Sequence, residues 1–209
     1  MKRRLIALAV ALLLAALAVG CSKNVDLERS YRGTRGSYFS MLQNWTRGDK
    51  VYDGLDCVLQ ARATLISEPM ETALNAERAR SHGPAKGVSA PERDVLGVAV
   101  RPELQLVMLA LYTQKSAAND IARQPSSWSV WLQNERGVTV QAESIIPVKV
   151  RPEELRELFP YLDGWSTPYL VLFPAQDDQG AALWDEQTAT LDCIVSGPIG
   201  RAQMTWRFK

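Results

Sequence analysis

The sequence predicts a mainly β fold: an antiparallel, immunoglobulin-like β-sandwich with two or three short connecting helices. Three observations lead to this prediction. About seven segments have strand-like apolar patterning, turn signals separate them, and the helix-like patterns between them are short. A small β-barrel is the alternative, because patterning identifies strands better than it identifies their order. A chain of 209 residues is long enough for one domain with a substantial core.

Two elements are expected before residue 66. Aromatic and apolar residues recur at spacings of three and four over residues 38–45, which predicts a short helix packed on the domain. Residues 55–65 then alternate between apolar and polar, with Leu55, Cys57 and Leu59 opening the apolar phase. A period of two buries one face of a strand, so this segment is predicted to be a half-buried strand.

Further helices are expected in three connections. Residues 67–82 are rich in Ala, Glu and Arg and are followed by Gly83, which predicts a helix of about three turns. Residues 89–92 have the spacing of a capping box, which predicts another short helix before Pro102. Residues 152–159 predict one or two helical turns.

The remaining strands are expected in the second half of the chain. Residues 104–113 are nearly all apolar and predict a strand covered on both faces, with a helix as the alternative. Turn-forming residues separate the later strand-like segments, most clearly at 133–137 and 197–200. Those segments are residues 128–132, 138–142, 145–150, 169–173, 188–196 and 202–208.

The first twenty residues have the organisation of an export signal. Residues 1–4 are basic, and the unbroken apolar run over 5–19 is too short to cross a bilayer core of about 30 Å as a helix. The run ends in Leu17-Ala18-Val19-Gly20-Cys21, which resembles the lipobox of bacterial lipoproteins. An ordinary secretory signal and a short anchor helix are the alternatives.

This resemblance implies a lipid anchor on Cys21. In bacterial lipoproteins the cysteine sulfur is alkylated with diacylglycerol, the signal is cut off before the cysteine, and the new amine is acylated, typically with palmitate. Several acyl chains hold a protein firmly at a membrane that it does not span. Ser22 stands where an Asp would retain a lipoprotein at the inner membrane. The resemblance therefore implies the outer membrane, at its periplasmic face.

The expected chain organisation has three parts. Residues 1–20 form the signal peptide and residues 21–37 form a polar, lipidated tether, in which apolar residues are scattered singly. Residues 38–209 form a single β-sandwich-like domain.

Two further cysteines are candidates for a disulfide. Cys57 and Cys193 both stand in the apolar phase of predicted strands. With Cys21 lipidated these two remain, and an even pair in an oxidising envelope favours a bridge between them. Two separate buried thiols that pack as small hydrophobes are the alternative.

Composition and motif content argue against several classes of function. A net charge of +1 and a single His argue against a nucleic-acid binder and a His-based metal site, and neither a metal nor a cofactor is expected. His82 ends a predicted helix, where a cation near the helix dipole is the simpler role than a general base. The sequence contains no Gly-x-Ser-x-Gly elbow, Ser-x-x-Lys motif or phosphate-binding glycine loop.

The tryptophans are candidates for a binding surface. Trp131 lies in a predicted strand, and Trp165 and Trp184 lie in loop-like surroundings. An exposed indole stacks on a sugar ring or on the apolar surface of a partner. The alternative is that these rings cover the ends of the core. Trp206 alternates with apolar neighbours and is expected inside the core.

The expected function is an interaction or accessory role. We expect a non-enzymatic envelope lipoprotein that contacts a protein partner at the membrane. A carbohydrate- or peptidoglycan-binding module that uses exposed Trp is the alternative. A hydrolase with carboxylates on loops is less favoured, because no pair of acids is singled out by the sequence.

Overall fold

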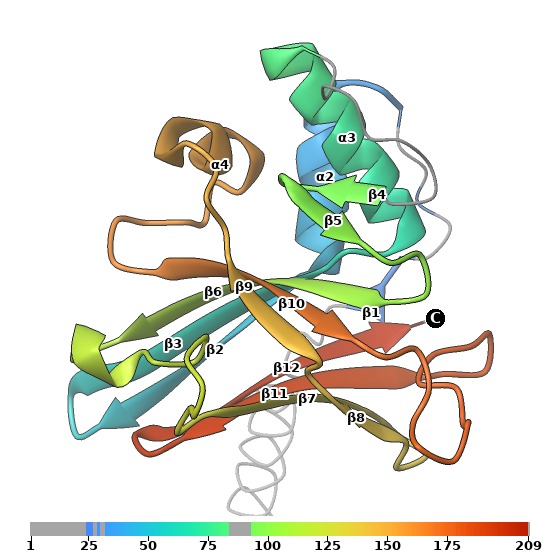
Figure 1. Ribbon diagram of the computed structural model, residues 1–209. Coiled ribbons are helices and arrows are strands. Elements are labelled where there is room, and N and C mark those ends of the chain that lie inside the picture. The colour runs from blue at the N-terminus through green and yellow to red at the C-terminus, as the bar shows by residue number, and fades with distance from the viewer. Residues whose placement is uncertain (1–23, 27–28, 30–31, 84–92, 209) are drawn as a thin grey trace, which may run out of the picture.

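Two five-stranded β-sheets lie against each other in the computed structural model, and helices cover one end of them (Figure 1). The structure describes residues 24–26, 29, 32–83 and 93–208. The predicted signal peptide, Cys21 and the capping-box segment lie outside the described residues. The mainly β prediction is confirmed, because the described chain forms open antiparallel sheets with three helices, as in a β-sandwich.

The first sheet contains both ends of the described chain. Its strand order is β1-β12-β11-β7-β8, and every pair is antiparallel except the parallel pair of β1 with β12. The hairpins predicted around residues 133–137 and 197–200 are confirmed as β7–β8 and β11–β12. The strands are β1 (Asn24–Val25), β7 (Ser129–Asn134), β8 (Thr139–Gln141), β11 (Thr190–Gly197) and β12 (Gly200–Phe208).

The second sheet is antiparallel throughout. Its strand order is β2-β3-β6-β10-β9. The apolar segment around residues 104–113 forms the central strand of this sheet and not a helix, because residues 106–111 are buried on both faces. The strands are β2 (Thr46–Asp53), β3 (Asp56–Leu65), β6 (Gln105–Thr113), β9 (Ser144–Pro147) and β10 (Thr167–Phe173).

Three helices and a small hairpin form what we call the helical cap, at the top of Figure 1. All three helices match helical segments predicted from the sequence. Among the described residues, no helix combines the length and apolar character needed to cross a membrane. The cap consists of α2 (Arg35–Trp45), α3 (Glu68–His82), α4 (Pro152–Leu158), β4 (Arg93–Val95) and β5 (Val98–Val100), and a 3-10 turn, η1 (Ser116–Ala118), follows β6.

Local sequence explains where the cap helices begin and end. The Thr34 side chain accepts a hydrogen bond of 3.1 Å from the backbone N–H of Ser37, which caps α2. Pro69 stands in the first turn of α3, where a missing N–H costs nothing. Gly83 ends α3 with a φ of 82°, a conformation that favours glycine.

Alternation along the strands builds the core between the sheets. The even-numbered residues of β12 from Ala202 to Phe208 point inward and are buried. Trp206 is completely buried, as predicted, and its indole N–H donates to the Trp45 carbonyl over 2.8 Å. This bond ties the C-terminal strand to the end of α2.

Polar contacts join the two sheets along one edge. The Asp49 carboxylate on β2 accepts a bond of 2.8 Å from the backbone N–H of Gln203 on β12. The Arg47 guanidinium donates to the Thr205 carbonyl over 3.2 Å. Side chains of the edge strand β2 therefore satisfy backbone groups of β12 in the other sheet.

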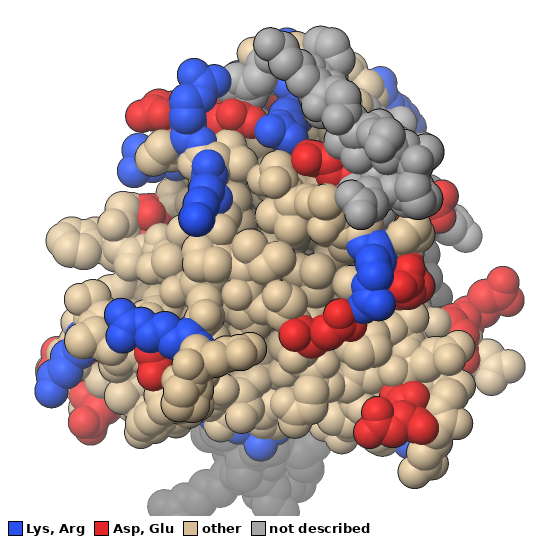
Figure 2. All heavy atoms as spheres, in the orientation of Figure 1, with Lys and Arg blue, Asp and Glu red and all other residues tan. Residues whose placement is uncertain are grey.

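Charged side chains avoid the middle of the face shown in Figure 2. Side chains of both signs lie around the helical cap and along the lower rim, whereas a broad area between them carries none of the four charged residue types.

Two predictions about local structure are wrong. Residues 93–100 form the β4–β5 hairpin where the sequence predicts part of a helix, because Leu96 and Gly97 have φ values of 55° and 80° and make a two-residue turn. Leu55 is fully exposed in the β2–β3 turn beside Gly54, so it does not belong to the buried face of β3. The buried alternation of that strand begins at Leu59.

The predicted disulfide is absent from the structure, in which Cys57 and Cys193 are both free. Cys57 lies near the β2–β3 turn. Cys193 pairs with Met204 on β12, and the neighbouring residue Gln203 donates its backbone N–H to Asp49 on β2. Cys193 therefore lies at the level of Asp49 in the other sheet. Asp49 pairs with Ala61, four residues or about 13 Å from Cys57 along β3. A disulfide requires Cα atoms within about 7 Å, so the two thiols stay apart.

Two residues of the predicted tether pack on the domain. Asn24 and Val25, which the sequence places in the tether, form β1, and Val25 is completely buried. The Asn44 side chain on α2 holds the next residue, Asp26, through two hydrogen bonds of 2.8 Å. A single apolar residue and one amide side chain thus attach the start of the described chain to the domain.

Candidate functional site

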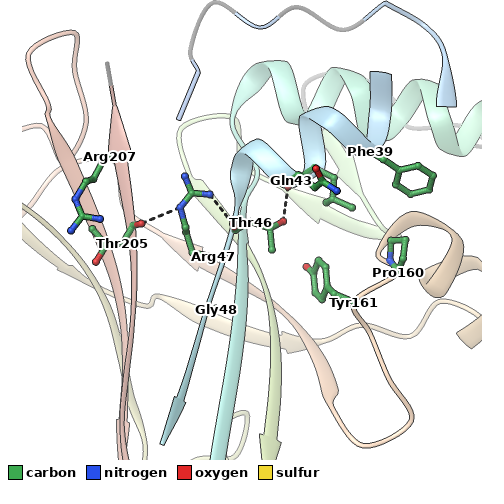
Figure 3. Close-up of a pocket in the computed structure, with 10 residues that line it drawn as sticks. Phe39, Gln43, Thr46, Arg47, Gly48, Pro160, Tyr161, Thr205 and Arg207 are labelled. Atoms are coloured by element: carbon green, nitrogen blue, oxygen red, sulfur yellow. Dashed lines mark hydrogen bonds between the residues drawn. The ribbon is translucent and has the colours of Figure 1, made fainter. Parts of the chain in front are cut away.

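A groove of about 970 Å³ lies where α2 runs into β2, and it is the best candidate for a binding site (Figure 3). Its volume is in the range of small-molecule sites. Four parts of the chain line it: α2, β2, the loop after α4, and the end of β12. The lining residues are Phe39, Leu42, Gln43, Thr46, Arg47, Gly48, Pro160, Tyr161, Thr205 and Arg207.

The direct junction of α2 with β2 shapes the groove. The helix ends at Trp45 and the strand begins at Thr46, which already has extended backbone angles (φ −105°, ψ 134°). The Thr46 hydroxyl donates to the Leu42 carbonyl over 2.7 Å and so satisfies an acceptor left open at the helix end. Gly48 follows, where a Cβ would stand only 3.2 Å from the Arg62 side chain. A side chain at this position would press on Arg62 of β3.

Three hydroxyl groups form a chain beneath the groove. The Thr46 and Thr64 hydroxyl oxygens are 2.7 Å apart, and the Thr64 oxygen is 2.7 Å from the Tyr161 phenol oxygen. Burial is the main cause that raises the pKa of the Tyr161 phenol above its ordinary value. The phenol therefore stays neutral at physiological pH and acts as a hydrogen-bonding group.

Two arginines supply positive charge at one side of the groove. Half-buried Arg47 donates from Nε to the Thr205 carbonyl over 3.2 Å and from Nη1 to the carbonyls of Asn44 and Thr46 over 3.0 and 2.7 Å. Burial, and secondly the charge of Arg207, lower the pKa of Arg47. Arginine remains protonated in proteins, so a fixed cation stands beside an exposed one. Figure 3 shows both on the β12 side.

The opposite side of the groove is apolar. Phe39, Leu42 and Pro160 line it, and Figure 3 shows the Phe39 and Pro160 rings across from the arginines. The Arg35 guanidinium lies 5.5 Å from the centre of the Phe39 ring, which adds a cation–π contact at the rim. None of the described lining residues carries a carboxylate. The groove therefore offers positive charge, hydrogen-bond donors and apolar surface to one ligand.

The tryptophans predicted as binding residues lie in three separate places, and none of them lines the groove. Trp131 is half-buried on β7, where the Arg201 guanidinium covers its ring at 5.6 Å. Trp165 is 80 % exposed in a loop that the Asp163 carboxylate holds through bonds from two backbone N–H groups. Trp184 is half-buried and stacks on Phe208, with ring centres 5.0 Å apart.

Trp184 lines a second, more polar hollow of about 550 Å³ at the start of α3. Thr72, Asn75 and Gln105 supply polar groups there. The hydroxyl of Ser67 lies buried in its wall and has no hydrogen-bond partner among the described residues. Trp184 therefore lines a hollow together with polar side chains.

Sequence reasoning did not single out the groove residues. Arg47 and Arg207 are 160 positions apart. Arg47 lies on β2, a strand that the sequence does not predict, and Arg207 resembles an ordinary outward residue of the last predicted strand. The one available signal was the exposed phase of the last strand, where Arg207 alternates with buried Trp206 and Phe208. No sequence pattern shows that this strand ends beside α2.

Comparison with known proteins found no match. No family model, no curated protein and no solved structure is significantly similar to the chain. Within the described ranges, no group of three or more His, Cys, Asp or Glu side chains is placed to hold a metal ion.

Proposed function

We propose that this chain is an outer-membrane lipoprotein of the bacterial envelope that acts by binding, without catalysing a reaction, and that the α2–β2 groove holds its ligand. The observation that carries the proposal is the lining of the groove, in which an apolar side meets two arginines and no acidic residue. Such a lining complements a ligand that joins an anionic group to an apolar part. The immunoglobulin-like arrangement stays a prediction, and the proposed function does not depend on it.

The N-terminal sequence supports the membrane anchor. Its basic start, apolar run and Gly20-Cys21 junction resemble a lipoprotein signal. Replacing Cys21 with Ser is expected to abolish palmitate incorporation and to leave the signal uncleaved. Metabolic labelling followed by the mass of the purified protein measures both. Palmitate incorporation that persists in the Cys21→Ser variant would contradict the anchor.

Photo-crosslinking in living cells tests the groove. Gln43 is exposed on α2 and lines the groove, whereas Gln141 is exposed on β8 and does not. A photo-reactive residue at position 43 is expected to give an adduct of small mass, and the same residue at position 141 is expected to give none. Equal adducts at both positions would overturn the groove as the site.

The class of adduct distinguishes the other expected occupants. A protein-sized adduct at position 43 would establish the protein partner anticipated from the sequence and would overturn the small anionic ligand. A carbohydrate adduct at position 43 would establish a glycan as the ligand and would likewise overturn the small anionic ligand. The mass of the adduct therefore decides among the three classes.

The Trp184 hollow supports a second candidate function, binding of a glycan. The indole gives a stacking surface and the amides of Asn75 and Gln105 give hydrogen bonds, which is the combination that sugar sites use. Replacing Trp184 with Ala is expected to abolish retention on a glycan column, with Trp165→Ala as the matched control outside the hollow. Equal retention of both variants and the unchanged chain would contradict glycan binding at the Trp184 hollow.

A further inference from the structure

The described chain begins beside the groove. Asn24 and Val25 pair with Arg207 and Phe208 on β12, and the burial of Val25 holds this pairing in place. Arg207 lines the groove. Residue 24 is therefore fixed next to the basic side of the candidate site.

The covalent chain limits how far Cys21 can be from this point. Three residue steps separate Cys21 from Asn24, and an extended chain spans at most about 3.6 Å per residue, so the two Cα atoms are within about 11 Å. With the lipid anchor of the proposed function on Cys21, the membrane surface lies close to Arg207. This step, and the inference built on it, rest on the proposed function.

The groove has the chemistry that a membrane lipid requires. Basic side chains near an anionic membrane surface strengthen binding by about fivefold each. Arg207 is exposed on β12, and backbone carbonyls orient Arg47 beside it. Phe39 and Pro160 give apolar surface a short distance away. Positive charge and apolar surface thus occur together at the end of the domain from which the anchor leaves.

We infer that the groove binds an anionic amphiphile taken from the membrane that anchors the protein. The anionic head group lies at Arg47 and Arg207, and the first part of the acyl chain lies on Phe39, Leu42 and Pro160. The domain then rests against the membrane at a defined orientation, with β1 and the end of β12 at the lipid surface. The anchor holds the protein at the membrane, and the groove sets how it faces the membrane.

Native mass spectrometry of the mature, membrane-extracted protein in non-ionic detergent tests this inference. The lipid probes are phosphatidylglycerol and phosphatidylcholine with identical acyl chains. At about fivefold for each of the two arginines, we expect phosphatidylglycerol to bind about 25-fold more tightly. The Arg207→Gln variant is expected to lose about fivefold of this affinity. Arg156→Gln is the matched control, because Arg156 is exposed on α4 and does not line the groove.

Competition experiments identify the source of the ligand. Dodecyl phosphate is expected to displace phosphatidylglycerol, and inorganic phosphate is not, because the apolar part contributes to binding. Displacement by inorganic phosphate at the same concentration would overturn the amphiphile. Binding of dodecanoate without binding of phosphatidylglycerol would show a soluble fatty acid and would overturn the membrane source.

The same spectra separate failure of the inference from failure of the proposed function. The intact mass reports whether the mature protein carries its acyl groups. A mass without acyl groups contradicts the anchor itself. An acylated protein that does not distinguish the two phospholipids, or equal losses in Arg207→Gln and Arg156→Gln, leaves the anchor standing and overturns this inference.

Discussion

The sheets and the helical cap bury polar groups of different kinds. In the strands the buried polar side chains are neutral, and they are Thr64, Thr113 and Asn134. The two buried carboxylates among the described residues, Glu77 and Glu154, are both on cap helices. Burying a charge is costly unless it is paired, so each of these carboxylates needs an arginine.

Arginines satisfy both carboxylates and join the elements of the cap. Arg78 on α3 donates to Glu154 on α4 over 2.9 Å and to Asp94 on β4 over 3.2 Å. Arg80 binds both oxygens of Glu77 at 3.0 and 2.6 Å. Removing one side chain, Arg78, would therefore loosen contacts among three elements of the cap.

The sheets and the helical cap should therefore respond to different perturbations. Apolar side chains hold the sheets together, so loss of buried volume should weaken them and a moderate fall in pH should not. Ion pairs help to hold the cap, so loss of one charge should weaken it. Hydrogen exchange measures the local unfolding of each element separately and can therefore test this contrast.

The largest effect is expected in the sheets. Leu106 is completely buried on the central strand β6, and Leu106→Ala should lower the free energy of unfolding by about 2–5 kcal/mol, because it leaves a cavity. Denaturant unfolding measures the change. Leu106→Met, which conserves volume, is the control and should cost less than about 1.5 kcal/mol. Equal losses in the two variants would show that volume at this position does not hold the sheets.

A smaller effect is expected in the cap. Arg78→Met should cost about 2–3 kcal/mol, because it leaves the Glu154 carboxylate buried without this partner. Hydrogen exchange should show the loss in α3, α4 and β4 and not in β6. Adding Glu154→Gln should recover part of it. Loss of protection spread evenly over β6 and the helices would contradict the separation of the two regions.

Acid should weaken the cap before it weakens the sheets. Hydrogen bonds from Arg80 are the main cause that holds the pKa of Glu77 below its ordinary value. Because the pKa is lower in the folded state, this stabilisation is present above the ordinary Glu value of about 4.3 and is lost as the pH falls through the folded value. Hydrogen exchange between about pH 5 and pH 3 should show α3 opening first. A Glu77→Gln variant whose α3 still responds equally to acid would contradict Glu77 as the cause.

The smallest effect concerns the two free thiols. Burial raises the pKa of Cys193 to about 12, so this thiol should not react in the folded protein. Cys57 is only half-buried and should react with a maleimide before unfolding. In the mature protein with Cys21 acylated, mass spectrometry should therefore give one label in the native state and two after denaturation. Two unreactive cysteines that become reactive only after reduction would reveal the disulfide and contradict the structure.

The sequence predicted the strands and helices better than it predicted the site. Alternation in residues 202–208 and the apolar run around 104–113 identify strands, because burial of one or both faces leaves a direct pattern. The hairpin around Leu96 was missed, since a Leu at positive φ gives no turn signal. The three tryptophans predicted to bind a ligand stand out by residue type and by their strand or loop surroundings, and none of them lines the groove.

The sequence alone predicts the mainly β class and the approximate bounds of most strands and helices, and it carries the signal from which we propose the membrane anchor. Tertiary packing brings β1 and the end of α2 beside β12, places Arg47 and Arg207 in one groove, and leaves Cys57 and Cys193 as free thiols. The difference lies in how far along the chain each interaction reaches. Periodicity and turn chemistry act between near neighbours in the chain, whereas the groove and the thiol separation depend on which strands of two sheets meet.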